Sequence, residues 1–211
     1  MNIASLVFNQ FQVNTYIVYD ETDECIIIDP ACYTQREKET LLQFIEDNNL
    51  KPIKIIITHC HVDHILGNKF ISEKFKISIQ AHQADIALLS SSVEYGSVYG
   101  FDVEKSPVVS KTIADNEIIK FGNSSLKAIH VSGHSPGSLC FYNEESKILV
   151  SGDVLFDGSI GRTDLPGGNY NELISGIKNK LLVLGDDVKV YPGHGTYTSI
   201  GRERKFNPFL K

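Results

Sequence analysis

Short hydrophobic runs separated by polar turns dominate the first part of the chain. The runs N-T-Y-I-V-Y (14–19) and E-C-I-I-I-D (24–29) flank the polar D-E-T-D (20–23), and this pattern predicts a β-hairpin. The mostly apolar I-K-I-I-I-T (53–58) predicts a buried strand. The chain therefore begins as a sheet.

Helical spacing follows these strands. Leu41, Phe44 and Ile45 share one face of a helix predicted over 34–49, which ends at N-N-L-K-P. A late helix is predicted from the spacing of Leu173, Ile174, Ile177 and Leu181. The remaining predictions are helices over 65–75 and 82–89, strands over 76–81, 125–131 and 188–191, and an irregular stretch over 90–110. With no linker or low-complexity segment, the length predicts one α/β domain over residues 1–211.

Two parts of the chain are weakly alike. Residues 16–29 and 139–153 both predict a hairpin whose second strand ends at an aspartate, Asp29 or Asp153. Each is followed by a predicted helix and by a strand that leads to a histidine, His59 or His194. Two related halves and a chance similarity both account for this pattern.

Composition excludes some function classes. The 211 residues carry a net charge of -6, and 42% of them are hydrophobic. An acidic chain lacks the electrostatic basis for binding nucleic acid or an anionic membrane, so we expect neither partner. The N-terminus lacks signal-peptide features, and no apolar run reaches about 18 residues. Four cysteines without a C-x-x-C pair indicate free thiols, so we expect a cytoplasmic protein. No feature predicts an oligomeric state.

Potential metal ligands are concentrated in T-H-C-H-V-D-H (58–64). His59 and His61 are two residues apart, so their side chains leave an extended chain on the same side. His64 follows three residues after His61, a spacing that suits a turn entering a helix, and Asp63 lies between them. Imidazole and carboxylate groups suit zinc, iron or manganese.

Three more candidates follow predicted strands. They are His134 in S-G-H-S-P-G-S, Asp153 in S-G-D-V-L-F and His194 in Y-P-G-H-G. Sites in open α/β sheets lie at the ends of strands, so we expect these side chains to join the first cluster. Neighbouring glycines allow the backbone to approach a crowded site.

These four motifs, in this order and spacing, resemble the metallo-β-lactamase superfamily. The stretches L-F-D-G-S-I-G-R-T-D-L-P-G-G and G-R-E-R-K-F-N-P-F-L are further similar to its short glyoxalase II-like branch. The resemblance implies a four-layer αββα sandwich. It also implies that His59, His61 and His134 bind one metal ion, that Asp63, His64 and His194 bind a second, and that Asp153 bridges the two.

The resemblance implies two divalent ions, with zinc expected and iron or manganese as alternatives. A hydroxide between them would attack the carbonyl of a small-molecule thioester, and Asp63 would orient it. A thiolate leaves without protonation, so no separate general acid is needed. Two alternatives remain open: a mononuclear iron persulfide dioxygenase, and a non-catalytic member of the fold.

Other residues carry weaker expectations. Arg162 either contacts a substrate carboxylate or pairs with Asp164. His82 is expected to cap a helix, His130 to support the site from a strand, and Cys60 to point away from the ligands.

The C-terminal segment bears on the thiol carrier. Phe206, Phe209 and Leu210 are expected to pack on the sandwich. Only residues 195–211 follow His194, too few for the added helical region that holds glutathione in longer glyoxalase II enzymes. We therefore expect a weak KM for S-D-lactoylglutathione and comparable rates on thioesters without glutathione.

Overall fold

The computed structural model describes residues 1–211, whose strands form two six-stranded sheets and one two-stranded sheet. The first sheet has the order β1 (Asn2–Phe8), β2 (Val13–Tyr19), β3 (Glu24–Ile28), β4 (Lys51–Ile56), β5 (Ile79–Ala81) and β6 (Val109–Thr112). The second has the order β14 (Thr198–Ser199), β13 (Lys189–Pro192), β10 (Ile148–Gly152), β9 (Leu139–Asn143), β8 (Ser124–His130) and β7 (Ile118–Phe121). β11 (Leu155–Phe156) pairs with β12 (Ser159–Ile160).

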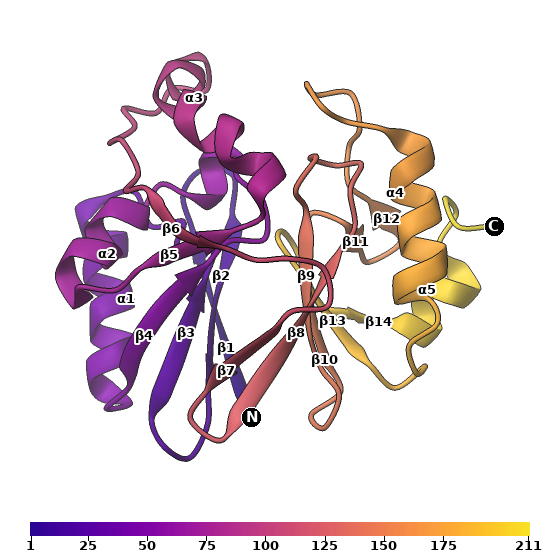
Figure 1. Ribbon diagram of the computed structural model, residues 1–211, viewed down its shortest axis with the longest axis horizontal. Coiled ribbons are helices and arrows are strands. Elements are labelled where there is room, and N and C mark those ends of the chain that lie inside the picture. The colour runs from indigo at the N-terminus through magenta and orange to yellow at the C-terminus, as the bar shows by residue number, and fades with distance from the viewer.

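Helices cover the outer faces of both sheets. α1 (Gln35–Asp47) and α2 (Asn68–Phe75) lie outside the first sheet, and α4 (Tyr170–Gly176) and α5 (Ile200–Phe206) lie outside the second (Figure 1). α3 (Ile86–Val98) lies at the end of the molecule beyond β5. The predicted four-layer αββα sandwich is therefore confirmed.

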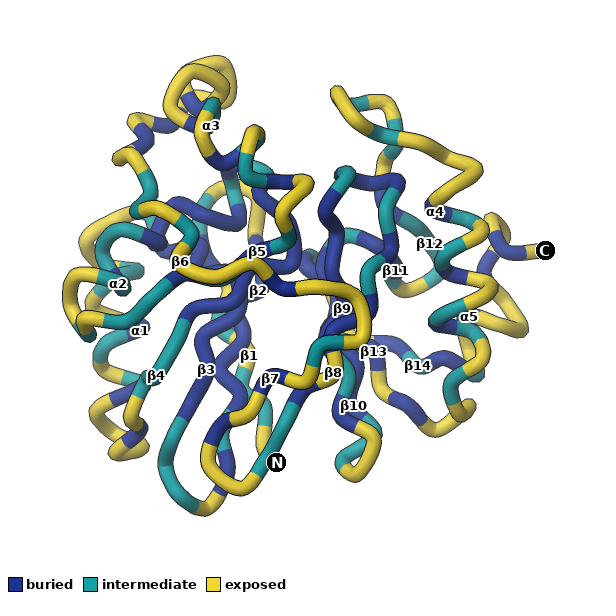
Figure 2. The backbone as a smooth tube through the Cα atoms, in the orientation of Figure 1, coloured by how far each residue is buried: buried dark blue, intermediate teal, exposed yellow.

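Alternating side chains build the layers. Ile26 and Ile28 of β3 belong to the core between the two sheets, where they join residues such as Phe141 of β9. Cys25 and Ile27 face the opposite way and pack in the core that includes α1. This division follows from the two-residue period of a strand. Strands such as β2 and β10 are buried along most of their length, whereas the helices expose their outer faces (Figure 2).

The start of α1 shows why the chain turns helical there. Thr34 is the N-cap, and its side chain accepts a hydrogen bond from the backbone N–H of Glu37. The Glu37 carboxylate accepts from the backbone N–H of Thr34 in return, which completes a capping box. The predicted helix over 34–49 is confirmed, with its N-cap at Thr34 and its C-cap at Asn48, one residue before the predicted end.

The similarity between the two halves is present in the topology. β2 and β3 are antiparallel, and β3 connects through α1 to the parallel strand β4. β9 and β10 are likewise antiparallel, and the segment after β10 contains α4 and returns as the parallel strand β13. Equivalent strands of the two sheets therefore end near each other, at one end of the sandwich.

The structure corrects several sequence-based predictions. The segment 90–110 is not irregular throughout, because α3 continues to Val98 and β6 begins at Val109. The hydroxyls of Ser90 and Ser91 donate to helix carbonyls one turn earlier, at 2.9 and 3.1 Å, so these polar residues do not interrupt the helix.

Smaller corrections concern the ends of elements. The helix predicted over 65–75 begins only at Asn68, and the strand predicted over 76–81 begins at Ile79. Leu210 is buried as expected, but Phe206 and Phe209 are 59% and 44% exposed, so their predicted packing on the sandwich is wrong. None of the helices is long and apolar enough to cross a membrane.

Candidate metal centre

All seven predicted ligand side chains meet at one end of the two sheets. His59 and His61 follow β4, and Asp63 and His64 lie in a single 3-10 turn, Val62–His64. The other three follow strands of the second sheet: His134 after β8, Asp153 after β10 and His194 after β13. Long-range folding therefore gathers residues that lie up to 135 positions apart in the chain.

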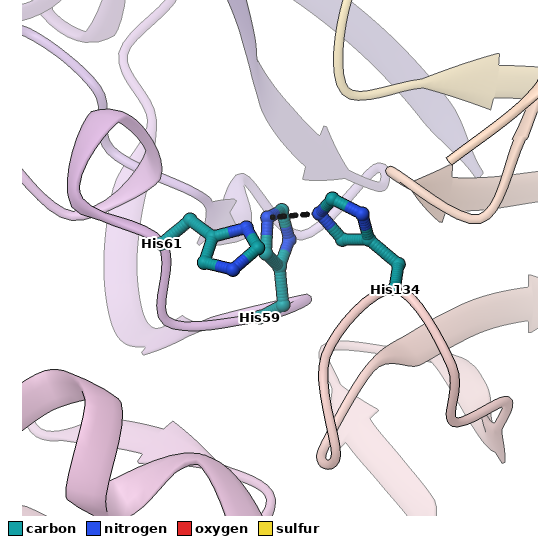
Figure 3. Close-up of side chains that lie close together, drawn as sticks. All are labelled: His59, His61 and His134. Carbon is teal, nitrogen blue, oxygen red and sulfur yellow. Dashed lines mark hydrogen bonds between the residues drawn. The ribbon is translucent and has the colours of Figure 1, made fainter. Parts of the chain in front are cut away.

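The first group consists of His59, His61 and His134. The Nε2 atoms of His59 and His134 lie 3.2 Å apart (Figure 3). The ring of His61 completes the group, with centroids 4.7 Å from His59 and 4.6 Å from His134. One possible ligand atom from each residue lies within 4.8 Å of the others, which is compatible with a single shared ion.

The second group consists of Asp63, His64 and His194. The Nε2 atoms of His64 and His194 lie 3.3 Å apart. The Asp63 Oδ2 atom lies 3.8 Å from His64 Nε2 and 3.4 Å from His194 Nε2. These three residues also offer ligand atoms within 4.8 Å of one another.

Asp153 lies between the two groups. Its Oδ2 atom is 3.6 Å from His134 Nε2 in the first group and 3.4 Å from His194 Nε2 in the second. Its Oδ1 atom is 3.5 Å from His64 Nε2. The carboxylate therefore approaches both groups, which is the position expected of a bridging ligand.

The outer nitrogens of four histidines have partners that set the direction of each ring. His134 Nδ1 lies 2.8 Å from the Arg162 carbonyl oxygen, and His194 Nδ1 lies 2.9 Å from that of Phe11. His64 Nδ1 lies 2.9 Å from the Asp29 carboxylate. His59 Nδ1 lies 3.1 Å from the Thr58 hydroxyl oxygen. Acceptors at Nδ1 favour the tautomer whose Nε2 lone pair faces inward, as in metal-binding histidines.

The chemistry of these donors fits divalent ions. Asp153 Oδ1 is buried and has no hydrogen-bond partner, although buried polar atoms normally have one. Pairs of inward Nε2 atoms with lone pairs repel each other unless a proton or a cation lies between them. Imidazole nitrogens and carboxylate oxygens suit zinc, iron or manganese, so the residues present fit such ions.

Charge in the centre is unevenly distributed. Burial and the neighbouring His134 ring lower the pKa of His61 to about 4. Burial also opposes charge on His194, but the carboxylates of Asp153 and Asp63 outweigh it and raise the pKa to about 9. The second group therefore attracts positive charge, whether it is carried by protons or by a cation.

Asp29 is a supporting residue whose role the sequence did not reveal. Its carboxylate accepts hydrogen bonds from the Thr58 backbone N–H at 2.7 Å and from the Thr58 hydroxyl at 2.5 Å, in addition to its contact with His64. Asp29, His59 and His64 also lie close enough to form a third ligand group. Because the Asp29 oxygens already have these partners, we assign Asp29 to orientation of His64. Its place at a strand end, equivalent to Asp153, was the available signal.

Asp85 is a second supporting residue that sequence reasoning missed. It is fully buried, and its carboxylate accepts from the backbone N–H of Cys60 at 2.9 Å and of Gly137 at 2.5 Å. The Ser135 hydroxyl donates to it at 2.8 Å. Asp85 thus ties the loop of His59 and His61 to the loop of His134.

Gly193 shows why small residues flank the proposed ligands. A Cβ atom at this position would overlap Asp153 Oδ1 and lie 2.8 Å from His64 Cε1. Any side chain would therefore displace the carboxylate that lies between the two groups. The close approach predicted from the glycine-rich motifs is confirmed at this position.

The structure also shows where the residues with weaker sequence-based expectations lie. Arg162 lines the cavity beside the proposed ligands, and its guanidinium donates to Asp164 at 2.8 and 2.7 Å. His82 caps a helical turn, as predicted, by accepting from the Ala84 backbone N–H at 3.3 Å. Burial raises the pKa of the Cys60 thiol well above its usual value, so this residue is no nucleophile.

His130 touches the loop of the centre but no ligand. Its Nε2 atom lies 2.9 Å from the Pro136 carbonyl oxygen, and its ring stacks on His82 with centroids 4.1 Å apart. The predicted supporting position on a strand is therefore present, at the base of the loop that carries His134.

Comparison with known proteins agrees with this arrangement. The Metallo-beta-lactamase superfamily profile matches residues 8–194. The hydroxyacylglutathione hydrolase GloC of Haemophilus influenzae is 36% identical over 100% of this chain and 98% of its own. The solved structure of BLEG-1 B3 metallo-beta-lactamase has a TM-score of 0.92 at 32% identity, with both chains fully covered. That of TTHA1623 in a di-iron-bound form has a TM-score of 0.89 at 32% identity, covering 98% of this chain and 100% of that one.

The profile match spans most of the chain and contains all seven clustered side chains. The 36% identity to the full-length Haemophilus relative is above the level at which two chains of this length share a fold and an ancestor. This chain belongs to the metallo-beta-lactamase superfamily.

Proposed function

We propose that this protein is a metal-dependent hydrolase of thioesters, similar to glyoxalase II. The observation that carries the proposal is the pair of three-residue ligand groups on either side of Asp153. The proposed ligands are His59, His61 and His134 for one ion, Asp63, His64 and His194 for the other, and Asp153 for both. The name of the Haemophilus relative, a hydroxyacylglutathione hydrolase, supports this reaction class.

Divalent ions bound there would polarise the carbonyl group of the substrate and bind a water that ionises near neutral pH. The residues of the chain hold and orient the reactants. Asp63 lines the cavity, where its carboxylate accepts a hydrogen bond from the attacking water and directs it. The carboxylic acids that line the cavity are Asp63 and Asp153, and both are proposed ligands. A leaving group that needs no proton, such as a thiolate, suits this arrangement.

We propose zinc as the resident ion, because buried imidazole and carboxylate ligands suit it. Iron and manganese satisfy the same donor set, and the TTHA1623 structure is named as di-iron-bound. The metal content of protein grown with each metal in turn decides between them.

A second candidate is β-lactam hydrolysis. The observation in its favour is the full-length match to BLEG-1, which is named a B3 metallo-beta-lactamase. Opening a β-lactam expels an amide nitrogen that must gain a proton, and the cavity has no carboxylic acid or histidine apart from its proposed ligands. We therefore rank thioester hydrolysis first.

The test compares three substrates on zinc-loaded protein. S-D-lactoylglutathione and the lactoyl ester of N-acetylcysteamine report thioester cleavage through thiol release, and a chromogenic cephalosporin reports β-lactam cleavage. We expect turnover of the thioesters, abolished in Asp153→Ala and retained in Val98→Ala, whose side chain is 77% exposed on α3. Turnover of the cephalosporin alone, or oxygen consumption with a persulfide and one iron per chain, would replace the proposal.

A further inference from the structure

Apolar side chains form much of the wall of the cavity that contains the metal centre. The cavity has a volume of ≈ 350 Å³, within the range of small-molecule sites. Five of the seven proposed ligands line it. The apolar part of the lining includes Phe11, Leu88, Tyr95, Tyr99, Phe156 and Leu165.

Two separate segments build the aromatic part of this wall. Phe11 lies in the turn between β1 and β2, while Tyr99 follows the end of α3, and their rings meet edge to face at 6.1 Å. The Gln10 side-chain amide donates to the Tyr99 carbonyl oxygen at 2.9 Å and joins the segments. Phe101 packs behind Phe11 at 5.6 Å. The wall is therefore assembled before a ligand arrives.

These aromatic side chains remain accessible to solvent. Phe11 is 41%, Tyr95 48% and Tyr99 39% exposed. Aromatic surface gathered beside a reactive centre is stabilised when an apolar ligand group covers it. The exposed rings thus point to a ligand with an apolar portion.

The charges of the cavity disfavour glutathione as the carrier. The tripeptide carries two carboxylates, which need cationic partners in a binding site. Arg162 is the one lysine or arginine among the lining residues, and two of its donors are already bonded to Asp164 at 2.8 and 2.7 Å. An uncharged carrier loses nothing in such a site.

We propose that the cavity selects thioesters with an uncharged apolar group, about the size of a phenyl ring, beside the bond that is cleaved. The identity of the reaction rests on the proposed function, whereas the binding preference rests on the aromatic wall and on the charges of the cavity. The apolar group can belong to the acyl side or to the thiol side, and matched esters distinguish the two.

The first experiment measures kcat/KM for two sets of esters on zinc-loaded protein. The thiol-side set keeps the D-lactoyl group constant and joins it to phenylmethanethiol, N-acetylcysteamine or glutathione, which are alkyl thiols of similar acidity. The acyl-side set holds N-acetylcysteamine constant and compares phenylacetyl with acetyl. In at least one set, we expect the apolar member to lead by about tenfold, mainly through KM.

Variants connect that preference to the wall. We expect Phe11→Ala and Tyr99→Ala each to lower kcat/KM for the preferred apolar ester by about tenfold. Val98→Ala is the matched control on α3, because its side chain is 77% exposed and does not line the cavity. If wild type and both wall variants preferred the apolar ester equally, the aromatic wall would not be the source of the preference, and the inference would be overturned.

A binding measurement separates this inference from the proposed function. Benzylacetone replaces the sulfur of S-benzyl thioacetate by a methylene group and cannot be hydrolysed. We expect ligand-observed NMR to detect its binding, weakened about tenfold in Tyr99→Ala. If it binds in this way while no thioester is cleaved, the proposed function fails and the binding preference stands. If the glutathione ester leads and benzylacetone does not bind, the preference fails and the hydrolase stands.

Discussion

His64 Nδ1 lies 2.9 Å from the Oδ2 atom of Asp29, a buried carboxylate at the end of the neighbouring strand β3. This contact leaves His64 Nε2 facing Asp63 and His194. Asp29 is held in turn by the backbone N–H and hydroxyl of Thr58. The direction of one proposed ligand is thus set by a residue that belongs to neither ligand group.

This contact predicts the effect of Asp29→Asn. The amide replaces one acceptor oxygen by a donor, so it cannot serve Thr58 and His64 together. Outer contacts of this kind contribute about 10- to 100-fold to metal affinity, and we expect a loss of that size for one of the two ions. Competition titration with a metal-sensitive dye measures it. Asp23→Asn in the β2–β3 turn, where the side chain is 50% exposed, is the control, and equal affinities in both variants would contradict the role of Asp29.

Metal content tests the pair of ligand groups. Protein purified with zinc or manganese supplied should hold close to two ions per chain, because each group offers three donors and Asp153 approaches both. Elemental analysis after removal of loosely bound metal measures the ratio. A single ion at saturation, with iron preferred, would favour the dioxygenase alternative instead.

Asp153 and Arg162 should differ sharply when each is replaced by alanine. The Asp153 side chain is only 11% exposed and lies between the two groups, whereas the Arg162 side chain is 60% exposed and paired with Asp164. We expect Asp153→Ala to lose at least about 100-fold in kcat and to bind less metal, and Arg162→Ala to change kcat by less than about tenfold. The bridging assignment is wrong if Asp153→Ala keeps wild-type turnover and metal content.

Asp85→Ala should destabilise the fold even without metal. The substitution leaves three buried donors, from Cys60, Ser135 and Gly137, without their acceptor. We expect the free energy of unfolding of the metal-free protein to fall by about 3 kcal/mol or more. Urea denaturation measures this change, with Asp102→Ala at an exposed position as the control. A difference below about 1 kcal/mol between the variants would show that Asp85 does not hold the two loops together.

Much of the local structure could be predicted from the sequence. The hairpin over 14–29 and the helix begun by Thr34 carry strong local signals, because turn residues and a capping box act within a few positions. The extent of α3 could not be predicted, since its serines are polar and suggest a loop. In the structure Ser90 and Ser91 bond within the helix, while Leu89 and Gly96 pack against the rest of the protein. Burial at these positions depends on distant residues.

The sequence by itself determined which side chains gather at the centre, because each of the four motifs comes after a strand and strand ends converge at one edge of a sheet. The family resemblance already implied how they divide into two groups around Asp153, but only the tertiary structure decided that Asp29 and Asp85 support them. It also decided that Arg162 pairs with Asp164 and that the rings of Phe11 and Tyr99 meet in the cavity wall. The physical reason is distance along the chain. Asp85 bonds Gly137 across 52 positions, and no local pattern records a contact that forms only when the two halves of the sandwich pack together.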